Sequence, residues 1–298
     1  MTAIANAFLA ACRDELAAPK PGNVHVYAAG HRMTVTDFEA SATAAAAPLC
    51  APGARVGARI RAAIAATRRA VGTNTNLGIV LLCAPLAAAA GLALGEDPQA
   101  RAQARADRHG GLRDLLVAVL DGLDVSDAED AFAAIVHASP AGLGRAGRHD
   151  VFAPPAVTLK EAMAEAQDRD RIARQYATGF ADVFDLGVPL HAAAAARGHE
   201  PRFVTLAVYL GLLSRFLDSH ICRKHGDAAA AEVRRTAQLF AAKLWDADDP
   251  ADLVPDLLGW DSRLKAEGLN PGTTADLTVA TLFAIRLQSV LPSAHIFG

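Results

Sequence analysis

Apolar positions recur at the three- and four-residue spacing of helices along most of the chain. The spacing predicts helices at about 2–17, 35–50, 55–71, 76–95, 111–122, 127–138, 201–220 and 277–290, and one that opens at Thr158. Alanine runs are frequent and aromatic residues make up only 5% of the chain, which favours closely packed helices over strands. We therefore predict an all-α protein. With 298 residues, 52% of them hydrophobic, the chain can form one compact domain over 1–298.

Charge and cysteine content narrow the expected partners and location. The formal net charge of -3 gives no basic field, so nucleic acid is not an expected partner. Four scattered cysteines without a C-x-x-C pair indicate neither a zinc site nor a disulfide framework, as expected in the cytoplasm. The uncharged run Leu77 to Leu94 approaches a membrane span in length, but Pro85 and the lack of flanking anchors favour a buried helix. We expect a cytoplasmic protein with small-molecule substrates, off the membrane, and consider a homodimer.

A polar loop, Thr73 to Gly78, directly precedes this apolar helix. Hydroxyl and amide side chains cap helices by accepting from free backbone N–H groups, and uncapped N–H groups can instead donate to a phosphate. Taken alone, the six residues fit a plain N-cap better. The candidate nucleotide-binding residues of the loop are Thr73, Asn74, Thr75, Asn76 and Gly78.

A rigid segment, Pro19 to His25, follows the first predicted helix, whose last turn carries Glu15. Prolines on both sides of Lys20 restrict its backbone, and Gly22 lets the chain turn. A lysine held in this way can face a phosphate, and the alternative is an ordinary solvated loop lysine. The candidate phosphate-binding residues here are Lys20, Gly22, Asn23 and His25.

Carboxylates follow a helical spacing after Thr158. Glu161, Glu165 and Asp168 stand at i, i+4 and i+7, so they are expected to share one helix face. Such a row can hold Mg²⁺, although on most helices it is merely solvated.

Two further polar stretches adjoin apolar helices, Asp218 to Gly226 and Asn270 to Asp276. Asp218 could pair with Arg215, or it could bind a metal or act as an acid or base while Arg223 or Lys224 contacts a phosphate. Polar helix ends in an otherwise hydrophobic α-protein suggest one polar cleft.

Together, and in this order along the chain, the motifs resemble the triphosphoribosyl-dephospho-CoA synthase family. The matching stretches, between about Glu15 and Phe283, are PKPGNVH, TNTNLG, Pro140–Gly144 before Asp150, 168–176, 218–226 and 270–276. The resemblance implies an all-α enzyme that transfers a triphosphoribosyl group from ATP to 3'-dephospho-CoA, releasing adenine. The product is a prosthetic-group precursor for acyl carrier proteins.

The resemblance also implies a nucleotide cleft with Mg²⁺ and a set of site residues. The expected catalytic residues are Asp218, Asp276, Glu15, Asp150 and His220. The expected metal ligands are Asp218, Asp276, Glu165 and Asp168. The further expected nucleotide contacts are Arg223, Asn270, Gly272 and Thr274.

The first polar loop departs from the family pattern, which reads close to N-T-H-K-G there. This chain has Asn76 and Leu77 in place of the imidazole and the cation, which should alter how phosphate or acceptor is held. An alternative is therefore a related step in tetrahydromethanopterin or methanofuran C1-carrier biosynthesis. A second alternative is a non-catalytic nucleotide-binding protein of the same fold, which would release no adenine from ATP.

Overall fold

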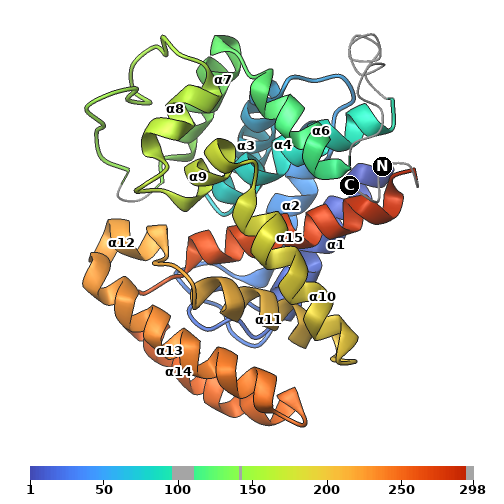
Figure 1. The fold of residues 1–298 in the computed structure, drawn as a ribbon. Helices are drawn as coiled ribbons and strands as arrows, with labels where there is room; N and C mark the ends of the chain where they lie inside the picture. The colour runs from blue at the N-terminus through green and yellow to red at the C-terminus, as the bar shows by residue number, and fades with distance from the viewer. Residues whose placement is uncertain (96–110, 141–142, 293–298) are drawn as a thin grey trace. The chain divides into compact units, whose positions relative to one another are not determined.

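The computed structural model describes residues 1–95, 111–140 and 143–292. Residues 141 and 142, part of the Pro140–Gly144 motif, lie outside these ranges. Within them the chain forms fourteen α-helices, a π-helical and a 3₁₀ segment, and no strand (Figure 1). The prediction of an all-α protein is confirmed. Among the helices in the described ranges, none combines the length with the apolar character that a membrane crossing needs.

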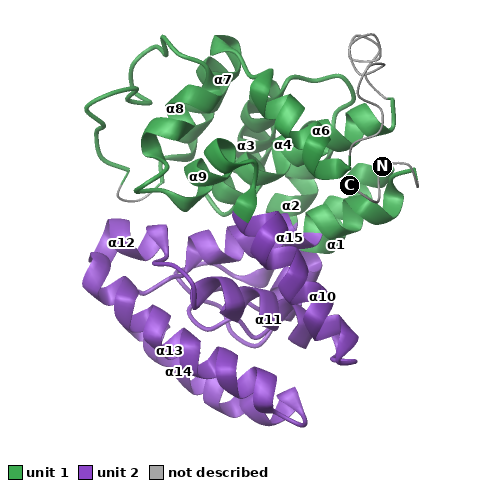
Figure 2. Cartoon of the chain, in the orientation of Figure 1, with its two compact units in different colours: residues 1–11, 40–181, 283–298 green, residues 12–39, 182–282 purple. Residues whose placement is uncertain are grey.

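The chain divides into two compact units (Figure 2). Unit 1 comprises residues 1–11, 40–181 and 283–298, and unit 2 comprises residues 12–39 and 182–282. Three of the four boundaries fall inside helices, α1 (Ala3–Ala17), α2 (Val35–Leu49) and α15 (Gly272–Val290), and the fourth lies between Ala181 and Asp182. The prediction of one domain over 1–298 stays a prediction.

Unit 1 has its apolar centre at α4 (Leu77–Ala93). Its other helices are α3 (Val56–Val71), α6 (Leu112–Asp121), α7 (Val125–Ala138), α8 (Leu159–Ala166) and α9 (Arg171–Thr178), with parts of α1, α2 and α15. Residues on all sides of α4 are buried, and the helix packs against α3, α6 and α9. A helix that is apolar all round belongs in a core, as the sequence predicted.

Unit 2 is organised around α11 (Pro201–Leu213), in which every residue from Phe203 to Leu213 is buried. Its other elements are η1 (Asp182–Gly187), α10 (Val188–Ala196), α12 (Ser219–His225), α13 (Asp227–Asp246), η2 (Pro250–Leu253) and α14 (Val254–Ala266), with parts of α1, α2 and α15. α11 packs against α10 and α13. Phe240 of α13 stacks on Trp260 of α14, with ring centroids 5.1 Å apart.

Three predicted helix boundaries are wrong, and each moves a candidate residue. The helix that opens at Thr158 ends at Ala166, so Asp168 lies beyond it and the carboxylate row does not share one face. The helix predicted to reach residue 220 ends at Leu213, which leaves Asp218 at the start of α12. α15 begins at Gly272, so Asp276 lies inside the helix instead of before it.

Candidate functional site

Unit 2 gathers buried polar side chains from three of the sequence motifs, and we call them the polar cluster. Its members are Glu15, Lys20, Asn23, His25, Asp218, Asp261, Asn270 and Thr274, each at most 8% exposed. They come from the end of α1, the loop that follows it, the start of α12, the last turns of α14 and the start of α15. Buried polar groups must find partners inside the protein, so their contacts show what each can do.

Lys20 is fully buried and its three ammonium protons are directed to three protein oxygens. The ammonium forms an ion pair with Glu15, and it donates to Asn23 Oδ1 at 3.1 Å and to the Val24 carbonyl at 2.9 Å. Burial raises the pKa of Glu15 and lowers the pKa of Lys20, while their mutual attraction opposes both shifts. A phosphate contact by Lys20 would require one of these bonds to break.

Asn23 extends this network to the start of α15. Its amide nitrogen donates to Asn270 Oδ1 at 2.8 Å, while its oxygen accepts from Lys20. Two predicted nucleotide-binding stretches, 247 residues apart in sequence, are therefore in direct contact. Lys20 acts here by fixing the orientation of an amide pair.

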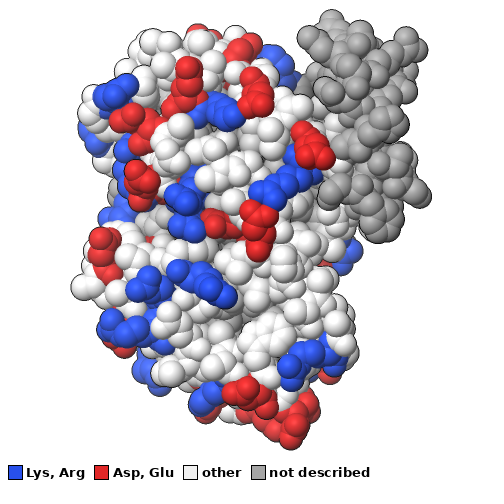
Figure 3. Space-filling view, viewed as in Figure 1, with Lys and Arg blue, Asp and Glu red and all other residues white. Residues whose placement is uncertain are grey.

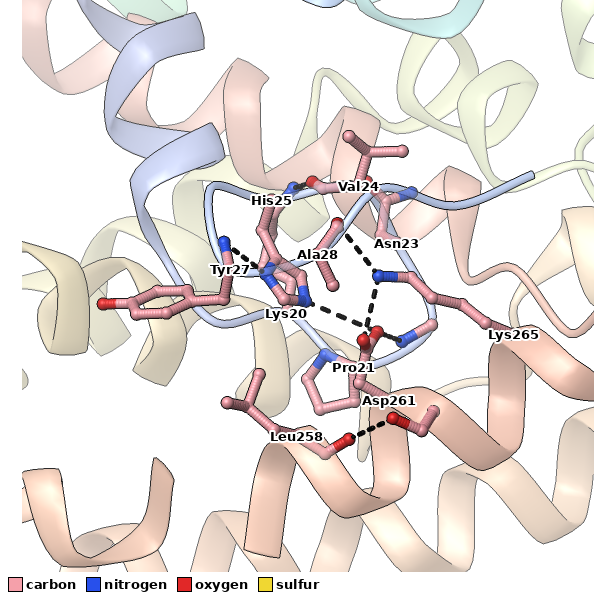
Figure 4. A network of polar contacts seen from close by, with 12 residues as sticks. Lys20, Pro21, Asn23, Val24, His25, Tyr27, Ala28, Leu258, Asp261 and Lys265 are labelled. Carbon is pink, nitrogen blue, oxygen red and sulfur yellow. Dashed lines mark hydrogen bonds and ion pairs between the residues drawn. The ribbon is translucent and has the colours of Figure 1, made fainter. Parts of the chain in front are cut away.

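Asp261 of α14 holds the same loop from the other side (Figure 4). Its carboxylate accepts from the Gly22 backbone N–H at 2.8 Å and from Lys265 Nζ at 2.9 Å. His25 Nδ1 accepts from the Tyr27 N–H at 3.3 Å, and its Nε2 lies 3.4 Å from Asp261 Oδ1. Burial opposes ionisation of Asp261, but the bonds from His25, Lys265 and Gly22 outweigh it and lower its pKa. Burial lowers the pKa of His25.

Gly22 occupies a position that other residues would not fit. Its φ of 83° is left-handed, and a Cβ there would lie 2.7 Å from Pro271 Cδ and 2.9 Å from Leu264 Cδ1. The adjacent Pro21 carbonyl accepts from the hydroxyl of Tyr209, a fully buried residue of α11, at 2.7 Å. Glycine therefore allows the loop to cross closely over the start of α15.

Asp218 joins the starts of two helices. Its Oδ1 accepts from the N–H groups of His220 and Ile221 at 2.9 and 3.2 Å, so it is the N-cap of α12. Its Oδ2 accepts from the N–H and the hydroxyl of Thr274, both at 2.8 Å. Burial raises the pKa of Asp218, while these four donors lower it, and the net shift is upward. Four donors satisfy a carboxylate, so the structure offers no lone pair of Asp218 to a metal.

His220 and Arg223 lie on α12 beside the polar cluster. A Cβ at Gly272 would lie 2.5 Å from His220 Nδ1, so the imidazole can occupy this position only because residue 272 is glycine. Burial, with Arg223 and Lys224 nearby, lowers the pKa of His220 to about 3. Such an imidazole is neutral and a weak base. Arg223 is exposed, and Asp276 is half-buried in α15, where its charge opposes the lowering of the Lys20 pKa by burial.

The Thr73–Gly78 loop lies in unit 1 and supports the start of α4. Asn74 Oδ1 accepts from the Leu77 N–H at 3.1 Å, Thr75 donates to the Ser41 hydroxyl at 2.6 Å, and Asn76 donates to the Thr67 hydroxyl at 3.1 Å. Thr73 is exposed and Gly78 is buried. The nucleotide contacts expected of this loop stay predictions.

The remaining candidates, Asp150, Glu165 and Asp168, also belong to unit 1. Asp150 accepts from the N–H groups of Ala146 and Phe152 at 3.1 and 2.9 Å and thereby shapes its own loop. Glu165 lies 3.8 Å from Arg148, and Asp168 is exposed. In the described ranges no three His, Cys, Asp or Glu side chains form a group that could hold a metal ion. The expected Mg²⁺ ligands are therefore not preassembled in these ranges.

Sequence reasoning missed Asp261, Lys265, Tyr209 and His31. Asp261 and Lys265 form an i,i+4 pair, a pattern that in sequence looks the same as any exposed helix pair. In the sequence, Tyr209 looks like one more apolar position of a buried helix, and only the structure shows where its hydroxyl lies. The Asp-Ser-His-Ile order did contain a usable signal, since aspartate before a helix is a common N-cap.

Comparisons with known proteins show which family the chain resembles. Residues 1–294 match the CitG family, described as ATP:dephospho-CoA triphosphoribosyl transferase. A crystal structure from Archaeoglobus fulgidus, of a protein to which triphosphoribosyl-dephospho-coA synthase activity is provisionally attributed, is similar with a TM-score of 0.61 and 21% identity. The match covers 82% of this chain and 96% of that chain, and at this identity it supports the fold alone. No curated protein matches the chain. Because the family match spans nearly the whole sequence, the chain belongs to the ATP:dephospho-CoA triphosphoribosyl transferases, which transfer a triphosphoribosyl group from ATP to dephospho-CoA.

Proposed function

We propose that the polar cluster of unit 2 organises the reacting groups for triphosphoribosyl transfer from ATP to 3'-dephospho-CoA. One observation carries this proposal: direct hydrogen bonds join three family motifs into a single cluster. Asn23 of the first motif donates to Asn270, and Asp218 of another accepts from Thr274. Preorganised polar groups on rigid helix ends are what a group-transfer site requires.

The reaction sets clear demands on this cluster. The bond between the ribose anomeric carbon and the adenine nitrogen breaks, and the oxygen of an acceptor hydroxyl forms a bond to that carbon. The hydroxyl proton passes to a base, and adenine takes up a proton as it leaves. Positive charge develops on the ribose in between, and a nearby carboxylate stabilises it.

Asp276 is the carboxylate that best fits this role. It is half-buried and its charge acts on Lys20. The four hydrogen bonds of Asp218 join the starts of α12 and α15, and Glu15 forms the ion pair that holds Lys20, so both carboxylates position the cluster. His220, with a pKa of about 3, is too weak a base to take a hydroxyl proton at neutral pH. We therefore assign Asp218, Glu15 and Lys20 to positioning.

Mg²⁺ enters this proposal with the substrate. Because the described residues hold no preassembled metal group, we propose that the ion arrives on the ATP triphosphate. Mg²⁺ in nucleotide sites commonly keeps phosphate oxygens and waters as its ligands. Adenine release is then expected to need Mg²⁺ and to stop when EDTA is added.

Incubation with ATP, Mg²⁺ and an acceptor tests the proposal. We expect free adenine, and a product whose mass equals dephospho-CoA plus a triphosphoribosyl group, when dephospho-CoA is supplied. A parallel arm with a tetrahydromethanopterin or methanofuran precursor extract tests the C1-carrier alternative. Product in that arm alone would contradict the proposed acceptor, and no adenine in either arm would favour a non-catalytic nucleotide-binding protein.

Asp276→Asn tests the residue assignment in the same assay. The amide keeps the size of the side chain but loses its charge and basicity, so adenine release should fall by about a hundredfold or more. Asp256→Asn, in α14 with a side chain that is 63% exposed, is the control of the same chemical change. An Asp276→Asn variant that is folded and as active as the parent would overturn the assignment.

A further inference from the structure

Basic side chains surround α12 on the face of unit 2 seen in Figure 3, where Lys and Arg gather over this helix. We call this set the cationic surface. It consists of Arg223 and Lys224 of α12, Lys265 of α14 and Arg32, which follows His31 in a turn, with the imidazoles of His31 and His220 beside them. The sequence predicted functional roles for His220 and for Arg223 or Lys224, but not for His31, Arg32 or Lys265.

A strained turn holds two of these residues. Gly30 and Met33 exchange backbone hydrogen bonds of 3.2 and 2.9 Å around His31 and Arg32, whose φ angles are 53° and 62°. Tight turns with two left-handed residues usually carry Asn or Gly, because other side chains cost about 1–2 kcal/mol each there. His31 Nε2 donates to the Gly22 carbonyl at 2.8 Å, and this bond anchors the turn to the polar cluster. The fold thus tolerates strain to place an imidazole and a guanidinium here.

Lys and Arg side chains lie close to the two imidazoles, and Lys265 Nζ donates to the Ala28 carbonyl at 3.1 Å, just before the turn. Burial lowers the pKa of His31, and the charges of Lys224 and Lys265 lower it further. Burial also lowers the pKa of His220, again with Arg223, Lys224, His31 and His225 adding to the effect. The lowered pKa values keep both imidazoles neutral at neutral pH, so the positive charge beside them comes from Arg223 and Lys224 of α12 and from Lys265 of α14.

Local carboxylates neutralise this surface only in part. Asp261 pairs with Lys265 and also accepts from Gly22, and Asp218 is enclosed by its four donors. Among the described residues, the exposed Arg32 and Lys224 form no ion pair and no side-chain hydrogen bond. An anion is what would complete the arrangement.

We propose that the cationic surface binds the polyphosphate chain of a substrate. A guanidinium offers two parallel donors to phosphate oxygens and an ammonium offers a compact charge, so Arg32 and Lys224 suit a chain of several phosphates. The inference rests on the proposed function, which requires two such chains: the triphosphate of ATP and the diphosphate of dephospho-CoA. Both present the same chemistry, and experiment distinguishes them.

Calorimetry with inorganic triphosphate and, separately, with dephospho-CoA tests the inference. The Arg32→Gln/Lys224→Gln variant should weaken binding of one of them by about tenfold or more, because charge-assisted hydrogen bonds are lost. The control, Arg235→Gln/Lys243→Gln, removes the same charge from α13, where both side chains are exposed and paired with acidic residues. The control should change the affinity by less than about twofold.

The outcomes separate the inference from the proposed function. Loss of triphosphate affinity assigns the surface to ATP, and loss of dephospho-CoA affinity assigns it to the acceptor. Unchanged affinity for both, or an equal loss in both variants, would overturn the inference, since the surface would then act only through net charge. Adenine release is measured in parallel: if the parent releases none yet binds triphosphate through Arg32 and Lys224, the proposed function fails and the inference stands.

Discussion

Asp218 offers a direct test of whether a motif carboxylate acts on the substrate or on the fold. In Asp218→Asn the amide oxygen can still accept from His220 and Ile221, but the amide nitrogen faces the Thr274 N–H, which is then left without an acceptor. A buried donor without a partner costs about 1–3 kcal/mol. Loss of the negative charge at the starts of two helices costs about 0.3–1 kcal/mol each. Relief of the carboxylate's desolvation offsets part of this, so we expect a net loss of about 2–3 kcal/mol.

Urea unfolding followed by circular dichroism measures this change. The urea concentration at the midpoint of unfolding should fall, while the slope of the unfolding free energy against urea concentration should not change. This combination indicates altered stability without an altered unfolded state. Asp124→Asn is the matched control, because Asp124 caps α7 through one bond of 2.9 Å and its side chain is 60% exposed. The control should lose less than about 1 kcal/mol.

Adenine release by folded Asp218→Asn completes the test. A positioning role predicts partial activity, since Asn can still cap α12. If the variant unfolds at the same urea concentration as the parent but releases no adenine, the carboxylate acts on substrate and our assignment to positioning is wrong.

The remaining predictions concern the loop, the buried ion pair and pH. Gly22→Ala should lower the free energy of unfolding by about 2–5 kcal/mol, because a Cβ there adds left-handed backbone strain and overpacking. Gly53→Ala is the control: its φ is 67° but no atom lies within 4 Å of the added Cβ, so only the backbone strain should lower its stability. Equal urea midpoints for the two variants would contradict the packing argument. Lys20→Met should lower the free energy of unfolding by about 3–5 kcal/mol, because it leaves the buried Glu15 carboxylate without its partner. The double variant Glu15→Gln/Lys20→Met should recover part of this stability. A double variant no more stable than Lys20→Met would show that loss of the ion pair is not the cause. His220 has a folded pKa of about 3 against 6.5 unfolded, so the unfolded chain binds the extra proton between these values and stability is lost as pH falls through that window. His220→Gln should weaken this pH dependence of stability. If urea unfolding shows that stability falls with pH below 6.5 as steeply in the variant as in the parent, His220 is not the group responsible.

The sequence by itself determined the helical class and most of the helices. The spacing of apolar residues is a local property, so helices predicted at 35–50 and 55–71 appear as Val35–Leu49 and Val56–Val71. Helix ends were less secure, because they depend on individual hydrogen bonds: Asp218 begins a separate helix that the apolar pattern does not reveal. The motifs themselves were recognisable, and the family match agrees with them.

Only the tertiary structure decided which polar groups meet and what remains of their bonding capacity. Gly22 and Asp261 are 239 residues apart in sequence and share a hydrogen bond of 2.8 Å, and no local spacing encodes that contact. Lys20 looks the same in sequence whether it faces a phosphate or a buried carboxylate. Its roles differ because burial obliges each of its protons to find a protein acceptor, and that requirement arises only when distant segments close over it.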